Sequence, residues 1–300
     1  MKKFVLGYIF SERKMGNEEK IFIKLCKKKN IELVMFNILK KIDEFELEEK
    51  AKKCDLIFNN SAEEFAYEIV KTLEVLGKKV IEPSKTYYYA EDKWIFYLKC
   101  KEHKIPVPET ILLSENIILA KKELKEFAKW PVILKRVEGT WGEFVEKADN
   151  LKEAEKIIKK FWGKADERLP IIAQEFIRSP SYRVTLIGNK IVQTALKESK
   201  NWKATGNHQK KFKKFKVDKE LEKMINKIVN LVGVKICGID FMKKNGKNLL
   251  IEINTTPGFD FFLEEREMLI SKVLDFLKKS NASKNQKNPL VYHTLKCVVC

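Results

Sequence analysis

The first hundred residues alternate short apolar runs with amphipathic helical patterns, and this alternation restricts the fold more than any other feature of the chain. Strands are expected at residues 4–10, 32–36, 54–59 and 79–81. Helices are expected at 17–29 and 61–76, and one long helix from Ser84 to Lys104. Short strands separated by helices are typical of a parallel sheet covered by helices, which binds ligands beyond the carboxyl ends of its strands. We therefore predict an α/β domain over residues 1–83.

The remainder of the chain shows strands in consecutive pairs. Strands are expected at residues 130–137, 171–177, 182–187, 190–196, 236–242 and 247–254, and helices at 151–161, 218–232 and 263–278. Consecutive pairs favour antiparallel sheets with helices on one face, an α+β arrangement. We predict one such domain over residues 84–180, a second over 181–280, and a flexible tail over 281–300.

The chain carries a net charge of +18, from 60 basic and 42 acidic residues. A charge of this size favours a polyanionic partner. However, only six of the basic residues are arginines, and proteins that read base edges depend on arginine. Lysine-rich solvated faces and an anionic partner therefore both remain as interpretations. No apolar run approaches the roughly 20 residues of a membrane span, and no signal-peptide pattern opens the chain, so we predict a cytoplasmic protein without a membrane partner.

Six cysteines lie mostly within apolar or helical patterns, as is typical of reduced thiols in a cytosolic protein. Cys297 and Cys300 form a CxxC motif that has His293 nearby. These three residues could bind zinc, but the chain has no second CxxC motif. A loose tail is the alternative interpretation.

The sharpest motif is the strand pair that contains Asp240, Glu252 and Asn254. Glu252 and Asn254 are two residues apart on a strand, so their side chains leave the same face. Three oxygen-bearing side chains suit Mg²⁺, which prefers hard ligands. A two-residue turn at Asn245 and Gly246 would turn Asp240 away from Glu252, so the metal interpretation predicts an odd-length turn with a bulge at Gly246. The alternative is an edge strand whose acidic residues face water.

Three further segments carry candidate binding residues. Lys135 ends an apolar strand and precedes a loop with two glycines, which together could hold a triphosphate. The backbone of residues 174–177 could pair with a purine edge. Arg183 and Lys197 lie on the next two strands and could stabilise a transferred phosphoryl group. The alternatives are an ordinary turn, an ordinary strand and exposed cations.

These residues, in this order, resemble the ATP-grasp superfamily, and the resemblance covers most of the chain. The matching segments are residues 92–94, 105–108, 131–135, 174–177 and 182–183, and the set of Asp240, Glu252 and Asn254. Residues 139–142 and 252–258 are most similar to the RimK and LysX type of ligase, which attaches an amino acid to a carboxylate.

The resemblance implies an ATP-grasp fold, in which two α+β subdomains clasp ATP behind an N-terminal α/β domain. It also implies that ATP phosphorylates a carboxylate and that an amine attacks the acylphosphate. By resemblance, Arg183 and Lys197 are catalytic, and Asp240, Glu252 and Asn254 hold two Mg²⁺ ions, which Mn²⁺ can replace. The implied ATP-binding residues are Lys93, Lys135, Gly139, Thr140, Trp141, Gly142, Gln174, Glu175, Phe176, Ile177 and Ser181.

Two departures from the family pattern concern the substrates. Ser181 stands where the family commonly has an acidic residue for the ribose, and the loop over residues 201–216 lacks the family's Arg-Gly-Gly. Lys203, Lys210 and Lys211 could replace this segment in binding an anion, or they could form a solvated basic loop.

The function that we predict is a ligase that adds an amino acid such as glutamate to an acidic protein, a peptide or a small-molecule carboxylate. The alternative is an inositol-phosphate-type kinase with an ATP-grasp fold, which residues 6–14 resemble, although the segment between Lys197 and Asp240 is short, as in the ligases. A nucleic-acid-binding module would leave the three oxygen ligands unexplained. The oligomeric state stays open, with a homo-oligomer as one alternative.

Overall fold

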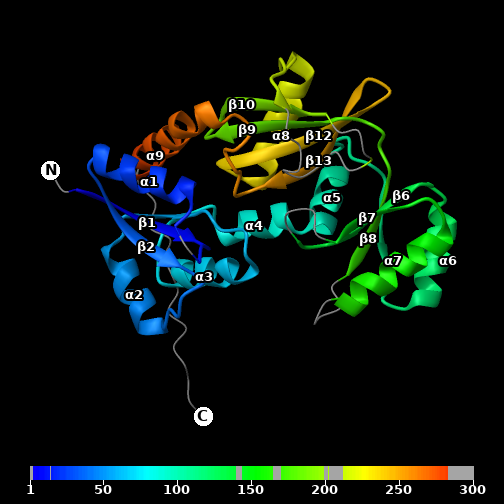
Figure 1. Cartoon of the computed structure of the whole chain (residues 1–300), viewed down its shortest axis with the longest axis horizontal. Helices are drawn as coiled ribbons and strands as arrows, with labels where there is room; N and C mark the ends of the chain where they lie inside the picture. The colour runs from blue at the N-terminus through cyan, green and yellow to red at the C-terminus, as the bar shows by residue number, and fades with distance from the viewer. Residues whose placement is uncertain are drawn as a thin grey trace, which may run out of the picture.

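The computed structural model describes residues 3–13, 15–139, 144–164, 170–198, 202 and 212–282. These residues form three sheets, which Figure 1 shows from the N-terminal part (blue) through the central part (green) to the C-terminal part (yellow). The N-terminal sheet is parallel, and the central and C-terminal sheets are antiparallel. The predicted combination of an α/β domain with α+β subdomains is confirmed.

The N-terminal sheet has the strand order β2-β1-β3-β4. Its elements are β1 (Phe4–Phe10), α1 (Asn17–Lys28), β2 (Ile31–Asn37), α2 (Glu44–Lys53), β3 (Leu56–Asn59), α3 (Glu64–Val75) and β4 (Val80–Ile81). Side chains alternate along β1, so that Leu6 and Tyr8 pack against α1, whereas Ile9 packs against α2 and α3. Helices therefore cover both faces, as expected for a parallel sheet.

The long helix predicted from Ser84 to Lys104 is wrong, because two helices occupy this segment. They are α4 (Ser84–Glu91) and α5 (Lys93–Glu102). Asp92 separates them in an extended conformation, and its Oδ1 accepts hydrogen bonds from the backbone N of Trp94 and of Ile95, both at 2.8 Å. Such a carboxylate cap favours a new helix start over a continuous helix. Lys93 consequently becomes the first residue of α5.

The central sheet has the strand order β5-β8-β6-β7, and two helices cover one of its faces. Its elements are β5 (Thr110–Leu113), α6 (Ile117–Phe127), β6 (Val132–Arg136), β7 (Val145–Ala148), α7 (Leu151–Lys164) and β8 (Ile171–Glu175). The sequence prediction missed β5, β7 and α6. The two strands are four residues long each, too short for a clear periodic pattern. The Asn116 cap of α6, followed by buried Ala120 and Leu124, is a signal that could have revealed the helix.

The C-terminal sheet has the strand order β11-β10-β9-β12-β13. Its elements are β9 (Ser181–Ile187), β10 (Lys190–Lys197), β11 (Phe212–Lys213), α8 (Lys219–Val232), β12 (Ile236–Lys244), β13 (Lys247–Asn254), a 3₁₀ turn (Leu263–Glu265) and α9 (Arg266–Ala282). Helix α8 covers one face of this sheet. Helix α9 instead packs on the N-terminal sheet beside α1, where Leu269 and Val273 join the core around Leu6 (Figure 1). Helix α9 thereby connects the N-terminal sheet with the C-terminal sheet, because Ile187 of β9 and Ile236 of β12 belong to the same core.

None of the helices in the described parts of the chain is long and apolar enough to cross a membrane. Within the same residues, Cys26, Cys54, Cys100 and Cys237 are buried free thiols. The CxxC motif at Cys297 and Cys300, together with His293, lies outside the described residues.

Glu82 follows β4, is fully buried, and joins the N-terminal domain to the start of β12. Its Oε1 accepts hydrogen bonds from the backbone N of Lys235 at 2.7 Å and of Ile236 at 2.6 Å. Burial raises the pKa of Glu82 from 4.5 to about 7. The folded protein therefore binds a proton that the unfolded chain releases, so the free energy of unfolding should decrease as the pH rises from about 4.5 to about 7.

The variant Glu82→Gln tests this linkage, because it keeps an acceptor oxygen but cannot ionise. Between pH 4.5 and pH 8, we expect the free energy of unfolding of the variant to fall by about 3 kcal/mol less than that of the wild type. Urea unfolding at each pH measures this difference. Part of the decrease should persist, since burial also raises the pKa of Glu18 to about 7. An unchanged pH profile in the variant would contradict the assignment.

Candidate active site

Asp240 on β12 lies at the centre of a buried group of charges. Its Oδ1 and Oδ2 accept hydrogen bonds from Nε and Nη2 of Arg183, each at 2.7 Å, and Lys197 Nζ donates to Oδ1 at 3.1 Å. Arg183 is directly opposite Asp240 on β9, and all three residues are buried. Burial alone would raise the pKa of Asp240, but Arg183 and Lys197 hold it well below its ordinary range. The three strands therefore hold two cations in fixed positions around one carboxylate.

Gly238 and Phe261 enclose the Arg183 side chain. A Cβ atom on Gly238 would lie 2.0 Å from Arg183 Nη1, so only glycine leaves room for the guanidinium here. The Phe261 ring centre lies 5.7 Å from Arg183 Cζ and 5.3 Å from Lys197 Nζ. The sequence prediction included neither residue, although a glycine inside a strand signals a close approach of another group.

The hairpin of β12 and β13 pairs Asp240 with Glu252, but not through the predicted turn. Asn245 and Gly246 form a two-residue turn with φ values of 53° and 79°, and Lys244 pairs with Lys247. The register then shifts between Asp240 and Phe241, so that Ile251 is the extra residue. The bulge predicted at Gly246 is therefore wrong, because Asn-Gly favours the tight hairpin turn. A bulge within the strand brings Glu252 opposite Asp240 instead.

The oxygen donors beside Asp240 fit a hard cation. Among the described residues, the Glu252 carboxylate makes no hydrogen bond or ion pair, and the side-chain N of Asn254 is buried without a partner. Asp240 differs from both, because Arg183 and Lys197 engage its oxygens. Mg²⁺ usually needs only one or two protein carboxylates, since water and phosphate complete its shell. Glu252 supplies one such carboxylate, and the amide oxygen of Asn254 is a further hard donor on the same strand.

Two lysines, one on β6 and one at the start of α5, line the same space. Lys135 on β6 is buried, and its Nζ donates to Gln174 Oε1 at 2.9 Å, while Gln174 Nε2 donates to Thr110 Oγ1 at 3.0 Å. Burial lowers the pKa of Lys135 to about 8. Lys93 Nζ donates to the Gly139 carbonyl at 3.0 Å. Lys93, Lys135 and Gln174 line one small cavity together.

The predicted nucleotide segment lines an adjoining cavity of about 40 Å³. Its lining includes Lys135, Gln174, Glu175, Phe176, Ile177, Trp202, Met242 and the bulged Ile251. The backbone N of Glu175 donates to Glu109 O at 2.9 Å, and that of Phe176 donates to Pro131 O at 3.2 Å. The backbone N–H groups of Glu175 and Phe176 are therefore occupied within the protein.

The remaining predicted residues divide into two groups. Ser181 is fully buried on β9, two residues before Arg183, and its Oγ has no partner among the described residues. Thr140, Trp141, Gly142, Lys203, Lys210 and Lys211 lie outside the described residues.

A family model described as a RimK-like ATP-grasp domain matches residues 90–275, which is more than half of the chain. The chain belongs to the RimK-like ATP-grasp family. The predicted resemblance and the predicted fold are both confirmed.

Relatives and solved structures agree with this membership. The alpha-aminoadipate–LysW ligase LysX of Saccharolobus solfataricus is 28% identical over 210 residues, which are 67% of this chain and 74% of the relative. A RimK-domain ATP-grasp protein of Sphaerobacter thermophilus superimposes with a TM-score of 0.72 at 15% identity, covering 91% of this chain and 98% of the other. The D-alanine–D-alanine ligase of Bacillus anthracis complexed with ATP gives 0.71 at 17% identity, with 94% and 98% covered. These two structures share the fold of this RimK-like protein.

Proposed function

We propose that this RimK-like ATP-grasp protein is an ATP-dependent carboxylate–amine ligase. The observation that carries the proposal is the buried cation pair of Arg183 and Lys197, held by Asp240 beside the free carboxylate of Glu252. A carboxylate oxygen attacks the γ-phosphorus of ATP, and ADP leaves. The amine nitrogen then attacks the acyl carbon, a C–N bond forms, and inorganic phosphate leaves with the electrons of the broken C–O bond. The nitrogen loses its proton to water.

Each residue has a physical role in this proposal. Lys93 and Lys135 bind the phosphates of ATP, and Arg183 and Lys197 stabilise the charge that develops on the transferred phosphoryl group. Glu252 and Asn254, with Asp240, would hold Mg²⁺, which neutralises the charge of the phosphates when bound.

We also propose that the chain divides into domains at residues 83 and 180. The buried free thiols support a cytoplasmic location.

The kinase alternative has less support. Several curated relatives of this chain are named as ligases, LysX and a coenzyme gamma-F420-2:alpha-L-glutamate ligase among them. No observation on the described residues favours a phosphorylated product over an amide.

The stoichiometry of the products tests the ligase function. The protein is incubated with Mg-ATP, pooled carboxylates and pooled amines, and ADP, free phosphate and adducts are quantified. A ligase releases one phosphate per ADP and forms an adduct that has lost the elements of water. ADP with a phosphorylated product and no free phosphate would instead establish the kinase, whereas no ATP turnover with any pair would contradict the proposal.

A further inference from the structure

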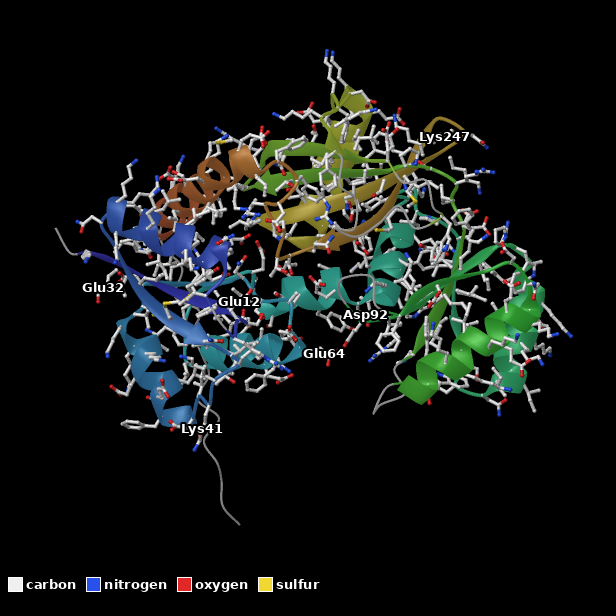
Figure 2. All side chains as sticks on the ribbon, viewed as in Figure 1. Glu12, Glu32, Lys41, Glu64, Asp92 and Lys247 are labelled. Carbon is white, nitrogen blue, oxygen red and sulfur yellow. The ribbon has the colours of Figure 1, made fainter. Side chains whose placement is uncertain are left out.

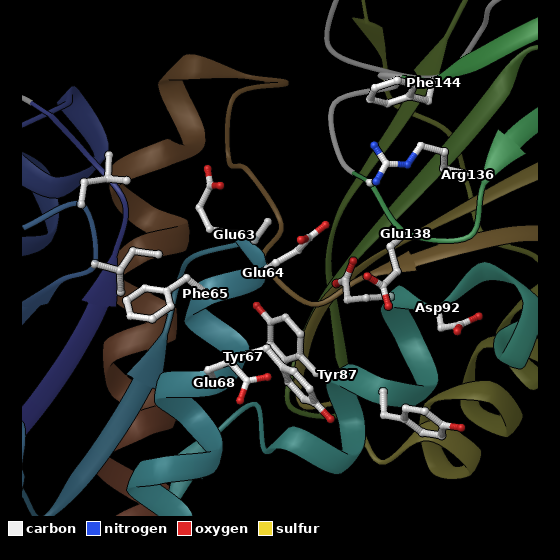
Figure 3. Close-up of a pocket in the computed structure, with 16 residues that line it drawn as sticks. Glu63, Glu64, Phe65, Tyr67, Glu68, Tyr87, Asp92, Arg136, Glu138 and Phe144 are labelled. Carbon is white, nitrogen blue, oxygen red and sulfur yellow. The ribbon is translucent and has the colours of Figure 1, made fainter. Parts of the chain in front are cut away.

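A cavity of about 680 Å³ lies beside the proposed phosphate site, between the N-terminal and the central domain (Figure 3). Residues of α3, of α4 and of the segment after β6 line it. Six of the lining side chains are carboxylates: Glu63, Glu64, Glu68, Glu91, Asp92 and Glu138. Arg136 is the cation in this lining. A cavity with this charge is unexpected in a chain whose net charge is +18.

Within the described residues, Arg136 makes no ion pair with these carboxylates. Its Cζ lies 4.4 Å from the ring centre of Phe144, and its Nε is buried without a hydrogen-bond partner among the described residues. Figure 3 shows Arg136 beside Phe144 and the carboxylates of Glu64 and Glu138 facing the open space, whereas Asp92 Oδ1 caps α5. Burial raises the pKa of Glu138, Glu64 and Asp92 raise it further, and Lys93 and Arg136 oppose the rise without cancelling it.

Elsewhere on the described surface, lysines pair with many of the carboxylates. In the cavity only Glu68 has such a partner, since Lys71 Nζ lies 2.6 Å from its Oε1 and 4.5 Å from the ring centre of Tyr67. Glu63, Glu64, Glu91 and Glu138 make no ion pair within the described residues. The charge of the lining is therefore available to a ligand, and a cleft lined by one sign of charge concentrates counter-ions.

Aromatic rings form a second, independent feature of the cavity. Phe65 and Tyr88 are 53% and 49% exposed, although large aromatic side chains are usually buried. Tyr67 and Tyr87 stack with ring centres 6.1 Å apart beneath them. Aromatic faces together with carboxylates bind ammonium groups, through cation–π attraction and charge-assisted hydrogen bonds.

The acidic surface continues toward the residues that follow β13. A second cavity of about 510 Å³ shares Ala62 and Glu63 with the first, and its further carboxylates are Glu12, Glu18, Glu19 and Asp260. Its arginine, Arg266, pairs with Asp260. Figure 2 shows Glu12, Glu64 and Asp92 following one another along this side of the molecule.

Direct contacts connect the acidic cavity to the candidate active site. Glu91 accepts hydrogen bonds from Thr255 Oγ1 at 2.6 Å and Thr255 N at 3.2 Å, and Thr255 follows Asn254. Asp92 caps the helix that begins with Lys93, whose Nζ reaches the Gly139 carbonyl. A molecule in the cavity would thus lie next to the site where the acylphosphate forms.

We propose that the amine substrate carries a second ammonium group, as a diamine, a polyamine or a basic amino acid does, and that the acidic cavity binds it. This inference rests on the proposed ligase function and specifies its amine. Glutamate, the amino acid first expected, would bring a net negative charge to carboxylates that lack cationic partners. The carboxylate substrate is activated at the cationic side, by Arg183 and Lys197.

Calorimetric titration in the absence of ATP tests the binding step separately from turnover. Spermidine, putrescine and L-lysine are compared with L-glutamate, using the full chain. We expect at least one of the three amines to bind at least tenfold more tightly than glutamate, and its affinity to fall with added salt. The double variant Glu64→Gln/Glu138→Gln should weaken that binding at least tenfold.

A matched control removes the same charge elsewhere. The double variant Glu48→Gln/Glu49→Gln changes two residues of α2 whose carboxylates both pair with Lys52, and it should leave amine binding unchanged.

Equal or tighter binding of glutamate, or equal effects of both double variants, would overturn the inference. If ADP and phosphate are released with glutamate but with none of the three amines, the inference fails and the ligase function stands. If the amines bind as expected but no pair of substrates supports ATP turnover, the ligase function fails instead.

Discussion

Replacing Asp240 with alanine should destabilise the protein by about 3–5 kcal/mol and abolish ATP turnover. Arg183 and Lys197 are 8% and 0% exposed, so the substitution leaves two buried cations without their carboxylate. Removal of one partner from a buried ion pair costs far more than the pair itself contributes, because water does not solvate the remaining charge. Urea unfolding measures the loss of stability, and ADP release measures the loss of turnover.

Two comparisons separate this effect from a general loss of a carboxylate. Asp275→Ala removes an ion pair to Lys29 in which the aspartate side chain is 62% exposed, and it should cost less than 1 kcal/mol. The double variant Asp240→Ala/Lys197→Met should be more stable than Asp240→Ala alone, since it removes one of the unpaired buried cations. If Asp240→Ala unfolds at the same urea concentration as the wild type, the charges are solvated and the buried group does not exist as described.

Replacing Lys135 with methionine should weaken ATP binding about 10- to 100-fold, because a buried charge-assisted hydrogen bond contributes about 1.5–3 kcal/mol. Lys135 suits this test because its Nζ is held in place by a hydrogen bond of 2.9 Å to Gln174 Oε1. Titration with Mg-ATP, followed by calorimetry, measures the dissociation constant. Lys129→Met is the matched control, because Lys129 pairs with Glu109 at the surface and should leave the constant unchanged.

The pH dependence of the dissociation constant for Mg-ATP is a second test of the role of Lys135. Burial lowers the pKa of Lys135 to about 8, so the free protein carries the charge below pH 8 and loses it above. Because the phosphates bind the charged form, the dissociation constant should be flat below pH 8 and rise about tenfold per pH unit above it. This rise should be absent in Lys135→Met. A flat profile to pH 10 in the wild type would exclude Lys135 from phosphate binding.

Local patterns predicted most of the fold correctly. The apolar run at residues 4–10 coincides with β1, and the strands that carry Asp240 and Glu252 form the expected hairpin. Both β1 and β12 are short, largely apolar runs, which is typical of buried strands. The prediction failed where a local signal is weak or competes with another. Asp92 stands within a helical pattern, yet its capping hydrogen bonds divide the helix into α4 and α5.

The sequence by itself determined the family, the α/β and α+β architecture and the hairpin that carries Asp240 and Glu252. The bulge that pairs these two residues was decided by the tertiary structure. Only the tertiary structure decided which charges compensate one another, because that depends on distances between residues far apart in the chain. Asp240 is bound to Arg183 and Lys197, whereas Glu63, Glu64 and Glu138 converge in one cavity without cationic partners among the described residues. A net charge of +18 describes the whole chain, and it does not reveal an acidic cavity that four separate segments create by folding together.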